Sequence, residues 1–297
     1  MEKRAFGNTD MQVSILGFGG AEIGFENVSL NVVKDLLAAA LDQGLNVVDT
    51  AECYVQSEEL IGAAVGARRK DFYLFSKCGH GPNFSDAWSK EDIAKTIERS
   101  LKRLKTEYLD LVQLHSCSED MLKKGEVIEA LQKAKKEGKT RYIGYSGDSD
   151  AALYACNTGA FDALQTSISV ADQEAIDKIL PVAREKNMGV IAKRPIANAA
   201  WRNKAKPSNS YIVEYWERLH KLNYDFIDGN NGHAAATALR FTLSIPGVSV
   251  AIVGTGKPGR WSENADLLSR GLLNEPEYAA IRSKWQEVAT PEWTGQT

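Results

Sequence analysis

The chain lacks a long apolar run and a block of like charge. Hydrophobic residues make up 43% and charged residues 25% of its 297 residues, and no window is apolar enough for a membrane-spanning helix. The first twenty residues contain no apolar stretch of signal-peptide length. Lys and Arg number 36 against 39 Asp and Glu, so the basic surface that binds nucleic acids is missing. We expect a cytoplasmic protein that binds a small molecule rather than a membrane or a nucleic acid.

Cysteine is also scarce. Four cysteines are too few and too scattered for a disulfide framework, which agrees with a reducing compartment. The spacing of Cys53, Cys78 and Cys117 matches no metal-binding motif, so we expect no metal site. Cys53 is next to Tyr54, Cys78 is next to Lys77, and Cys117 is two residues from His115. We leave the role of the three thiols open.

Short β-branched runs alternate with longer segments of helical period, which predicts βαβ units on a parallel sheet. Eight segments read as strands: 13–16, 45–49, 72–77, 109–115, 142–146, 163–166, 189–193 and 249–254. Helices are expected between them, among others at 32–43, 90–105, 127–136, 173–186 and 234–244. Eight strand and helix pairs fit a closed barrel better than an open, doubly wound sheet.

We therefore predict an α/β fold in a single domain over residues 1–297. It is a (β/α)8 TIM barrel with a short N-terminal β-hairpin and extra helices near the C-terminus. The glycine run at 17–20 lacks the G-x-G-x-x-G spacing of a Rossmann dinucleotide site. Two long irregular stretches, 78–89 and 196–209, follow the third and seventh strands, on the face where barrels build active sites.

Ionisable residues end three apolar strands. Asp49, Lys77 and His115 occupy these ends, and Tyr54 follows Asp49 by five residues. Buried charges are costly unless they are paired, so these groups need each other or a ligand. Lys77, held by Asp49, would stabilise the phenolate and lower the pKa of Tyr54, and His115 would orient a substrate oxygen. Alternatively, Lys77 is the Schiff-base lysine of a barrel lyase or aldolase.

Around these residues the sequence resembles the aldo-keto reductase family. The matching motifs, in family order from about residue 4 to 265, are DTAECY at 49–54, SEELIG at 57–62, FSK at 75–77, DLVQLH at 110–115 and IGYS at 143–146. The resemblance implies that Asp49, Tyr54, Lys77 and His115 form the catalytic tetrad, with Tyr54 as general acid or base. A histidine at position 115, where a C=C-reducing variant carries glutamate, implies reduction of C=O groups.

The resemblance also implies a dinucleotide that lies extended across the barrel mouth. Ser146 and Gln165 match positions that hold the nicotinamide carboxamide. The segment 254–264 resembles the loop and short helix that bind the adenosine phosphate, with candidate contacts at Gly254, Thr255, Arg260, Glu263 and Asn264. The sequence departs from the family at Gly254, where a basic residue is usual, at Gly147, where asparagine is usual, and at Lys193, where an aromatic residue is usual. Lys193 and Arg194 are expected at the pyrophosphate instead.

We therefore expect an NADP-dependent aldo-keto reductase that takes NADPH, with detectable use of NADH, and reduces aldehydes or ketones to alcohols. Trp88 and Trp201, in the irregular stretches, are candidates for an apolar substrate wall. The alternative is a nucleotide-binding sensor or regulatory subunit on the same fold, without significant turnover. The physiological substrate and the oligomeric state stay open.

Overall fold

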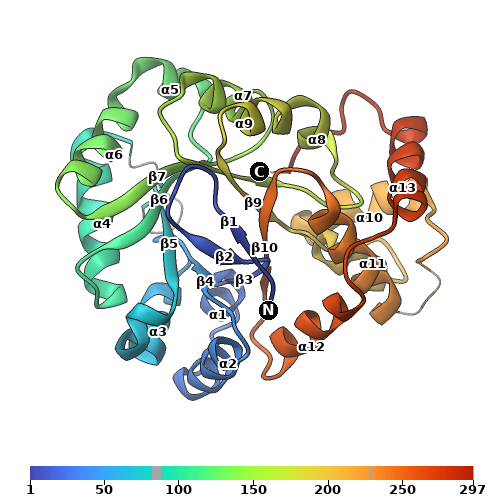
Figure 1. Ribbon diagram of the computed structural model, residues 1–297, viewed down its shortest axis with the longest axis horizontal. Coiled ribbons are helices and arrows are strands. Elements are labelled where there is room, and N and C mark those ends of the chain that lie inside the picture. Colours follow the sequence, from blue (N-terminus) through green and yellow to red (C-terminus); the bar gives the residue numbers. More distant parts are fainter. Residues whose placement is uncertain (82–87, 228, 230, 297) are drawn as a thin grey trace.

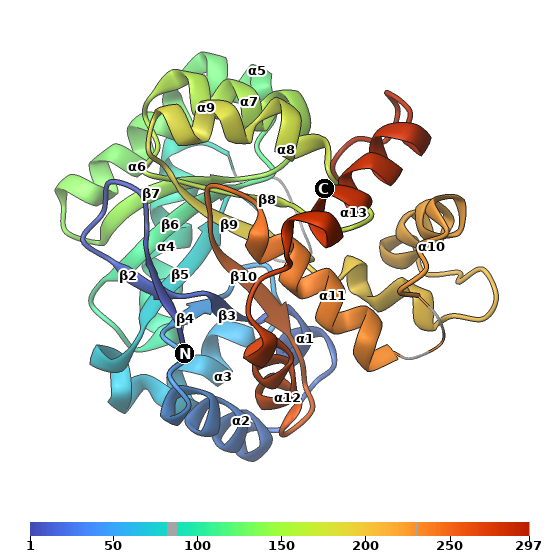
Figure 2. The ribbon, with the colours of Figure 1, turned by 45° about the vertical axis from the view of Figure 1, so that its right-hand side comes forward.

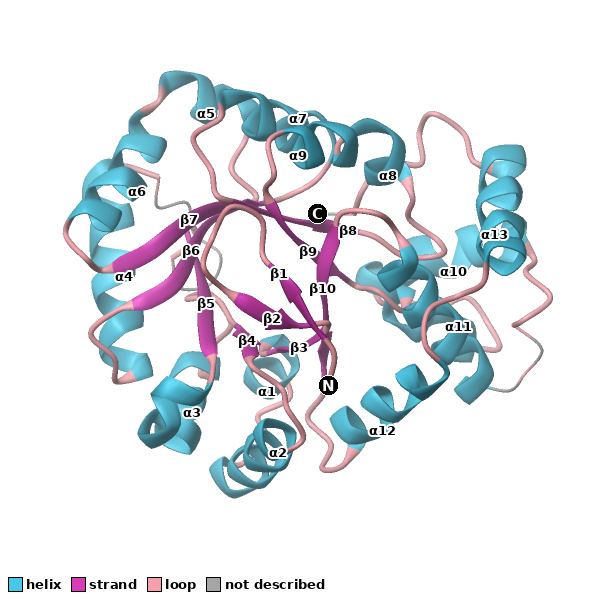
Figure 3. Cartoon of the chain, in the orientation of Figure 1, coloured by secondary structure: helices cyan, strands magenta, loops and turns pink. Residues whose placement is uncertain are grey.

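The computed structural model describes residues 1–81, 88–227, 229 and 231–296, the side chain of Asn231 excepted. Parallel strands form a closed barrel in the order β10-β3-β4-β5-β6-β7-β8-β9, and helices surround it (Figures 1 and 3). The barrel strands are β3 (Leu16–Gly19), β4 (Val47–Asp49), β5 (Tyr73–Cys78), β6 (Leu109–His115), β7 (Thr140–Ser146), β8 (Ala163–Ser167), β9 (Gly189–Lys193) and β10 (Val248–Gly254). The predicted (β/α)8 barrel is confirmed.

The helices follow the strands around the ring. They are α1 (Ala21–Phe25), α2 (Leu30–Asp42), α3 (Ser57–Val65), α4 (Lys90–Leu104), α5 (Glu119–Lys124), α6 (Glu126–Lys136), α7 (Ser149–Thr158), α8 (Glu174–Lys178), α9 (Leu180–Glu185), α10 (Ser210–Leu222), α11 (Asn231–Ser244), α12 (Arg260–Asp266) and α13 (Glu275–Val288). Three 3-10 segments complete the description: η1 (Gly66–Asp71), η3 (Ala197–Arg202) and η4 (Leu267–Arg270). Helices α10 and α13 lie to one side of the ring (Figure 2), as expected for extra helices near the C-terminus.

Helix α4 shows why these segments become helices. Ser89 caps its first turn by accepting a hydrogen bond from the backbone N–H of Asp92 at 3.1 Å. Lys105, with φ of 54°, ends it in the left-handed conformation. Its apolar stripe, which includes Ile97 and Leu104, is buried against the barrel.

The first barrel strand does not lie where the sequence predicts it. The segment predicted at 13–16 is divided: β2 (Gln12–Ser14) pairs with β1 (Lys3–Ala5) in the N-terminal hairpin, and β3 begins at Leu16. Gly17 and Gly19 of the glycine run are part of β3, where the closing strands approach closely. A Cβ at Gly17 would lie 3.1 Å from the Ile252 side chain.

The helix predicted at 173–186 is two helices. Pro181 cannot donate a backbone hydrogen bond and lies in the first turn of α9, which is where a helix tolerates proline. The chain therefore ends α8 at Lys178 and starts α9 at Leu180. Among the described residues no helix is long and apolar enough to cross a membrane.

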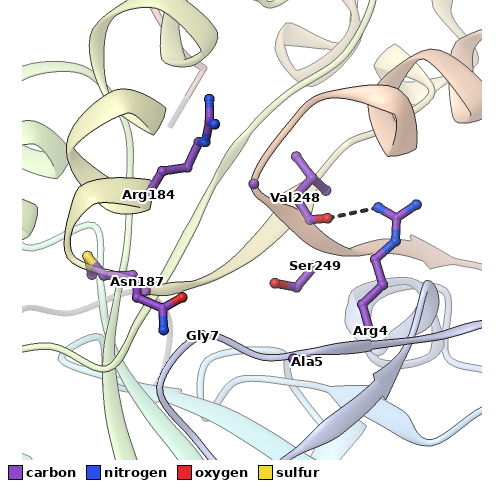
Figure 4. A pocket seen from close by; sticks show the side chains of 9 residues that line it. Arg4, Ala5, Gly7, Arg184, Asn187, Val248 and Ser249 are labelled. Atoms are coloured by element: carbon purple, nitrogen blue, oxygen red, sulfur yellow. Dashed lines mark hydrogen bonds between the residues drawn. The ribbon is translucent and has the colours of Figure 1, made fainter.

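The N-terminal hairpin closes one end of the barrel. Phe6 and Met11 are fully buried and join interior side chains such as Phe75 and Leu111 in one apolar cluster. Burial of each such side chain contributes about 1.5–3 kcal/mol. Beside the hairpin a cavity of about 310 Å³ is lined by Arg4, Ala5, Gly7, Arg184, Asn187, Met188, Gly247, Val248 and Ser249 (Figure 4).

The segment after α13 returns to the opposite end, where the strands finish (Figure 2). The backbone carbonyl of Gln296 accepts hydrogen bonds from Ser167 at 2.9 Å and from Arg194. The backbone N–H of Gly295 donates to Glu174 at 2.7 Å, and that of Gln296 donates to Asp172 at 3.2 Å. Residues 293–296, called the C-terminal tail below, are therefore held in a polar cradle beside the barrel mouth.

Candidate active site

The four predicted tetrad residues meet at the C-terminal ends of β4, β5 and β6 and in the loop that follows β4. The Lys77 ammonium donates to Asp49 Oδ2 at 2.5 Å and to the backbone carbonyl of Thr50 at 2.9 Å. Lys77 Nζ lies 4.9 Å from the centre of the Tyr54 ring. The rings of Tyr54 and His115 meet edge to face, with centroids 5.7 Å apart. The sequence-predicted constellation is thus a single cluster of side chains in contact.

The ion pair determines which chemistry Lys77 can perform. Asp49 and Lys77 are 1% and 2% exposed, and separation of such a buried pair would leave an uncompensated charge. Lys77 is therefore held as an ammonium by a carboxylate and a carbonyl. A Schiff-base lysine needs a neutral, nucleophilic amine, so the geometry speaks against the lyase alternative.

Burial controls the protonation of the two groups nearest the mouth. Desolvation raises the pKa of the Tyr54 hydroxyl well above its ordinary value, and the charge of Asp49 acts in the same direction. Desolvation also lowers the pKa of His115 well below its usual range, assisted by the positive charge of Lys77. At neutral pH the site therefore holds a protonated phenol and a neutral imidazole. The expected lowering of the Tyr54 pKa by Lys77 is wrong for this structure, because burial dominates and Asp49 neutralises the ammonium.

The cysteines near the tetrad are buried thiols. Burial raises the pKa of Cys53 and of Cys117 to about 12 and also raises that of Cys78. At Cys53 the positive charge of Lys77 acts in the opposite direction, but burial outweighs it. Cys53 Sγ lies 3.5 Å from Nδ1 of His115, and this contact between a thiol and the imidazole was not predicted.

Below the tetrad lies an amide pair of which the sequence reasoning found only one member. Gln113 donates to Gln165 Oε1 at 2.9 Å, and both amide nitrogens face Asp49, at 3.4 and 3.5 Å. Gln165 and Ser146 are register partners on adjacent strands and both are buried. Gln113 was missed, although its position two residues before His115 on one strand places both side chains on the same face.

Lys193 and Arg194 both have protein partners. Lys193 Nζ lies 2.8 Å from Asp148 Oδ2. The Arg194 guanidinium donates to the Gln296 carbonyl and lies over the Tyr211 ring, 4.6 Å from its centre. Both cations stand at the barrel mouth, but their expected contact with a pyrophosphate stays a prediction.

The segment after β10 carries the remaining cofactor candidates. A Cβ at Gly254 would lie 1.6 Å from Glu22 Oε2, so a carboxylate from α1 fills the space where the family usually has a basic side chain. Arg260 and Glu263 form an ion pair at 2.8 Å on α12. Thr255 and Asn264 are buried in the same segment. The surroundings of Gly254 are therefore acidic rather than basic.

The two substrate candidates lie in different segments of the chain. Trp88 packs on Gly79, where a Cβ would lie 2.2 Å from its ring, and on His80, at 5.3 Å between ring centres. The ring of His80 is 5.4 Å from that of His115, which places Trp88 near the tetrad. Trp201 lies in η3 and packs against the main core. Residues 82–87 of the predicted substrate loop lie outside the described part of the chain.

No group of three His, Cys, Asp or Glu side chains suited to a metal ion occurs within the described ranges. The cavity of Figure 4 lies at the hairpin end of the barrel, where Arg4 donates to the carbonyl of Val248 at 2.9 Å. It is therefore separate from the tetrad. The candidate active site is the barrel mouth.

A closed parallel barrel with ionisable side chains gathered at its strand ends is the architecture of a barrel enzyme. Comparison with known proteins narrows the class. Residues 15–286 match the model of the aldo/keto reductase family. The chain is 30% identical to the uncharacterized oxidoreductase YqkF of Bacillus subtilis strain 168, over 95% of this chain and 96% of that protein. It is 29% identical to an L-galactose dehydrogenase of Arabidopsis thaliana, over 93% and 92%.

The fold comparison agrees. A holo-form aldo-keto reductase from Bacillus halodurans superposes with a TM-score of 0.85 at 25% identity, over 99% of both chains. The protein belongs to the aldo/keto reductase family. It is accordingly an oxidoreductase of a family that uses nicotinamide cofactors.

Proposed function

We propose that the protein is an NADPH-dependent reductase of aldehydes or ketones in which Tyr54 protonates the carbonyl oxygen. The observation that carries the proposal is the buried cluster in which Tyr54, His115 and the Asp49–Lys77 ion pair meet. We further propose a cytoplasmic location and a small carbonyl compound as substrate.

The donor set at the mouth fits a nicotinamide cofactor. The carboxamide of nicotinamide is planar and needs both donors and acceptors, which the Ser146 hydroxyl and the Gln165 amide supply from adjacent strands. Arg260, on α12, and Lys193 and Arg194, at the mouth, are the cations proposed for the phosphates. When bound, the reduced cofactor supplies a hydride to the carbonyl carbon.

The protein groups then handle the oxygen and its proton. Since Cys53 remains a protonated thiol, its S–H can donate to Nδ1 of His115, which leaves Nε2 as the protonated nitrogen. An N–H at Nε2 and the Tyr54 hydroxyl together offer two hydrogen bonds to a substrate carbonyl. Tyr54 transfers its proton as negative charge develops on the oxygen, and the Lys77 ammonium, 4.9 Å from the centre of the Tyr54 ring, offsets part of the cost of the buried phenolate.

The decisive experiment is Tyr54→Phe, which removes only the hydroxyl. We expect cofactor affinity, measured by cofactor fluorescence, to stay within a few-fold of the wild-type value. Turnover of a panel of aldehydes and ketones should fall about 10²-fold or more, the scale of a lost general acid. Wild-type turnover in the variant would contradict the mechanism. Cofactor binding without turnover by the wild-type protein would favour the nucleotide sensor.

A further inference from the structure

Gln113 connects the tetrad to the proposed carboxamide site from below. It is fully buried in the barrel interior on β6, and Gln165 on β8 is 2% exposed. The 2.9 Å bond from Gln113 Nε2 to Gln165 Oε1 joins the two amides. Each amide nitrogen also faces one oxygen of Asp49, which Lys77 holds from the other side. The four side chains come from four different strands and form one polar layer.

The charge on Asp49 determines how both amides are turned. A carboxylate can only accept hydrogen bonds, so each amide directs its nitrogen towards Asp49. The oxygen of Gln165 then faces Gln113, which donates to it. One N–H of Gln165 faces Asp49, and its second N–H remains for a ligand at the mouth. Without Gln113, Gln165 Oε1 would lose this donor, and only the 3.5 Å contact with Asp49 would hold the amide in place.

The interior is shaped around this side chain. A Cβ at Gly144 on β7 would lie 3.0 Å from the Ala163 carbonyl oxygen and 3.1 Å from Cγ of Gln113, so glycine avoids a close contact with both. Oε1 of Gln113 is buried and has no hydrogen-bond partner within the described part of the chain. An unpartnered buried acceptor is costly, and an apolar side chain would avoid that cost. Gln113 is therefore better explained by what its nitrogen holds than by stability.

We propose that Gln113 is a positioning residue that fixes Gln165, so that an N–H of Gln165 meets the carboxamide oxygen of the nicotinamide cofactor. The inference rests on the proposed function, because it assumes that Gln165 binds the carboxamide. It gains weight from Gly147, whose missing side chain leaves Ser146 and Gln165 as the carboxamide partners.

The test is Gln113→Met, which keeps the length of the side chain and removes its hydrogen bonds. We expect the Kd of NADPH and of NADH, measured by fluorescence titration, to rise by a similar factor of roughly three to ten. The Kd of 2′,5′-ADP, which lacks nicotinamide, should not change. Leu111→Met is the matched control, because Leu111 is also a buried interior residue of β6, and it should leave all three constants unchanged.

A double-mutant cycle separates positioning from general destabilisation. In a Gln165→Met background the carboxamide partner is already lost, so Gln113→Met should add little to the Kd of either nucleotide. Additive effects, or equal weakening of 2′,5′-ADP, would overturn the proposal. If Gln113→Met does not fold, Gln113→Asn, which is too short to reach Gln165, replaces it with the same expected pattern. Failure of the wild-type protein to bind either nucleotide would instead refute the proposed function.

Discussion

At the scale of single residues, nucleotide preference depends on charges around the segment after β10. Arg260 is the proposed partner of the ribose phosphate that distinguishes NADPH from NADH. Arg260→Ala should raise the Kd of NADPH about tenfold or more and leave that of NADH nearly unchanged, because one charge-assisted contact contributes roughly 1.5–3 kcal/mol. Fluorescence titration with both nucleotides measures this. Equal weakening of both would place Arg260 on the adenine or in the fold.

The preference itself should be modest. Glu22 fills the space beside Gly254, so the family's second basic side chain is replaced by a carboxylate. Glu22→Gln tests this explanation, because it keeps the shape of the side chain and removes its charge. It should tighten NADPH more than NADH, and a strong wild-type preference for NADH would contradict the assignment of NADPH.

Asp172, in the polar cradle, gives a prediction about pH. Burial, with the nearby charge of Asp148, raises the pKa of Asp172 to about 8, so the folded protein keeps a proton that the unfolded chain releases near pH 4. Its favourable contribution is therefore present at low pH and is lost as pH rises towards 8. The free energy of unfolding of Asp172→Asn, relative to wild type, should increase by roughly 1 kcal/mol per pH unit between pH 5 and 8.

Chemical denaturation at several pH values tests this prediction. Asp35→Asn, at an exposed position on α2, is the control and should run parallel to wild type. If the curves of Asp172→Asn and wild type are also parallel, Asp172 is ionised in the folded protein.

The tetrad could be predicted from the sequence because three of its four residues lie at the ends of predicted strands. Asp49, Lys77 and His115 each end an apolar run, and parallel strands bring their carboxyl ends to one edge. The pKa of Tyr54 could not be predicted in the same way. It depends on how far the hydroxyl is desolvated and on the distance from Lys77 to Asp49, and neither is encoded in spacing along the chain.

At the scale of elements, the C-terminal tail depends on a close backbone approach. A Cβ at Gly295 would lie 2.6 Å from Cβ of Asp148, which no ordinary contact allows. Gly295→Ala should therefore release the tail and its hydrogen bonds to Glu174, Asp172 and Ser167, and the free energy of unfolding should fall by about 1–3 kcal/mol.

Carboxypeptidase digestion followed by mass spectrometry reports the release directly. Residues 294–297 should be removed faster from Gly295→Ala than from wild type. Thr294→Ala is the control, because Thr294 uses its backbone carbonyl, which accepts from Arg218 at 2.8 Å. Equal digestion rates would mean that the cradle adapts to the methyl group.

Strands β4 to β10 and helices such as α4 could be predicted, because the spacing of their apolar residues and the capping residues of the helices agree with the fold. The position of the first strand could not, since glycine has a low strand propensity and the pairing of Gly17 and Gly19 with β10 joins residues far apart in the sequence. Pro181 is the local signal for the break after Lys178. The helix predicted at 173–186 rested on the apolar period alone and therefore joined α8 and α9. The contacts that hold the C-terminal tail could not be predicted from the sequence, because they join residues more than 75 positions apart.

At the scale of the whole molecule, a single barrel should unfold in one transition, and bound cofactor should raise the Tm of that transition. NADPH at about 100 times its Kd should stabilise the fold by about 2.7 kcal/mol, which raises Tm by roughly 5 °C for a chain of this size. Scanning calorimetry measures both the shift and the number of transitions. Tyr54→Phe, which keeps cofactor affinity, should show the same shift, and two separate transitions would contradict a single domain.

The two ends of the barrel differ in what can be attached to them. The N-terminal hairpin closes the end away from the tetrad, and Met1 there is 41% exposed, whereas the C-terminal tail lies in the cradle beside the mouth. An affinity handle or surface tether joined to the N-terminus would immobilise the molecule with its active site facing the solution. A handle joined to the C-terminal tail would begin beside the cradle and the mouth, so we expect biosensor or flow-reactor formats to work better with N-terminal attachment.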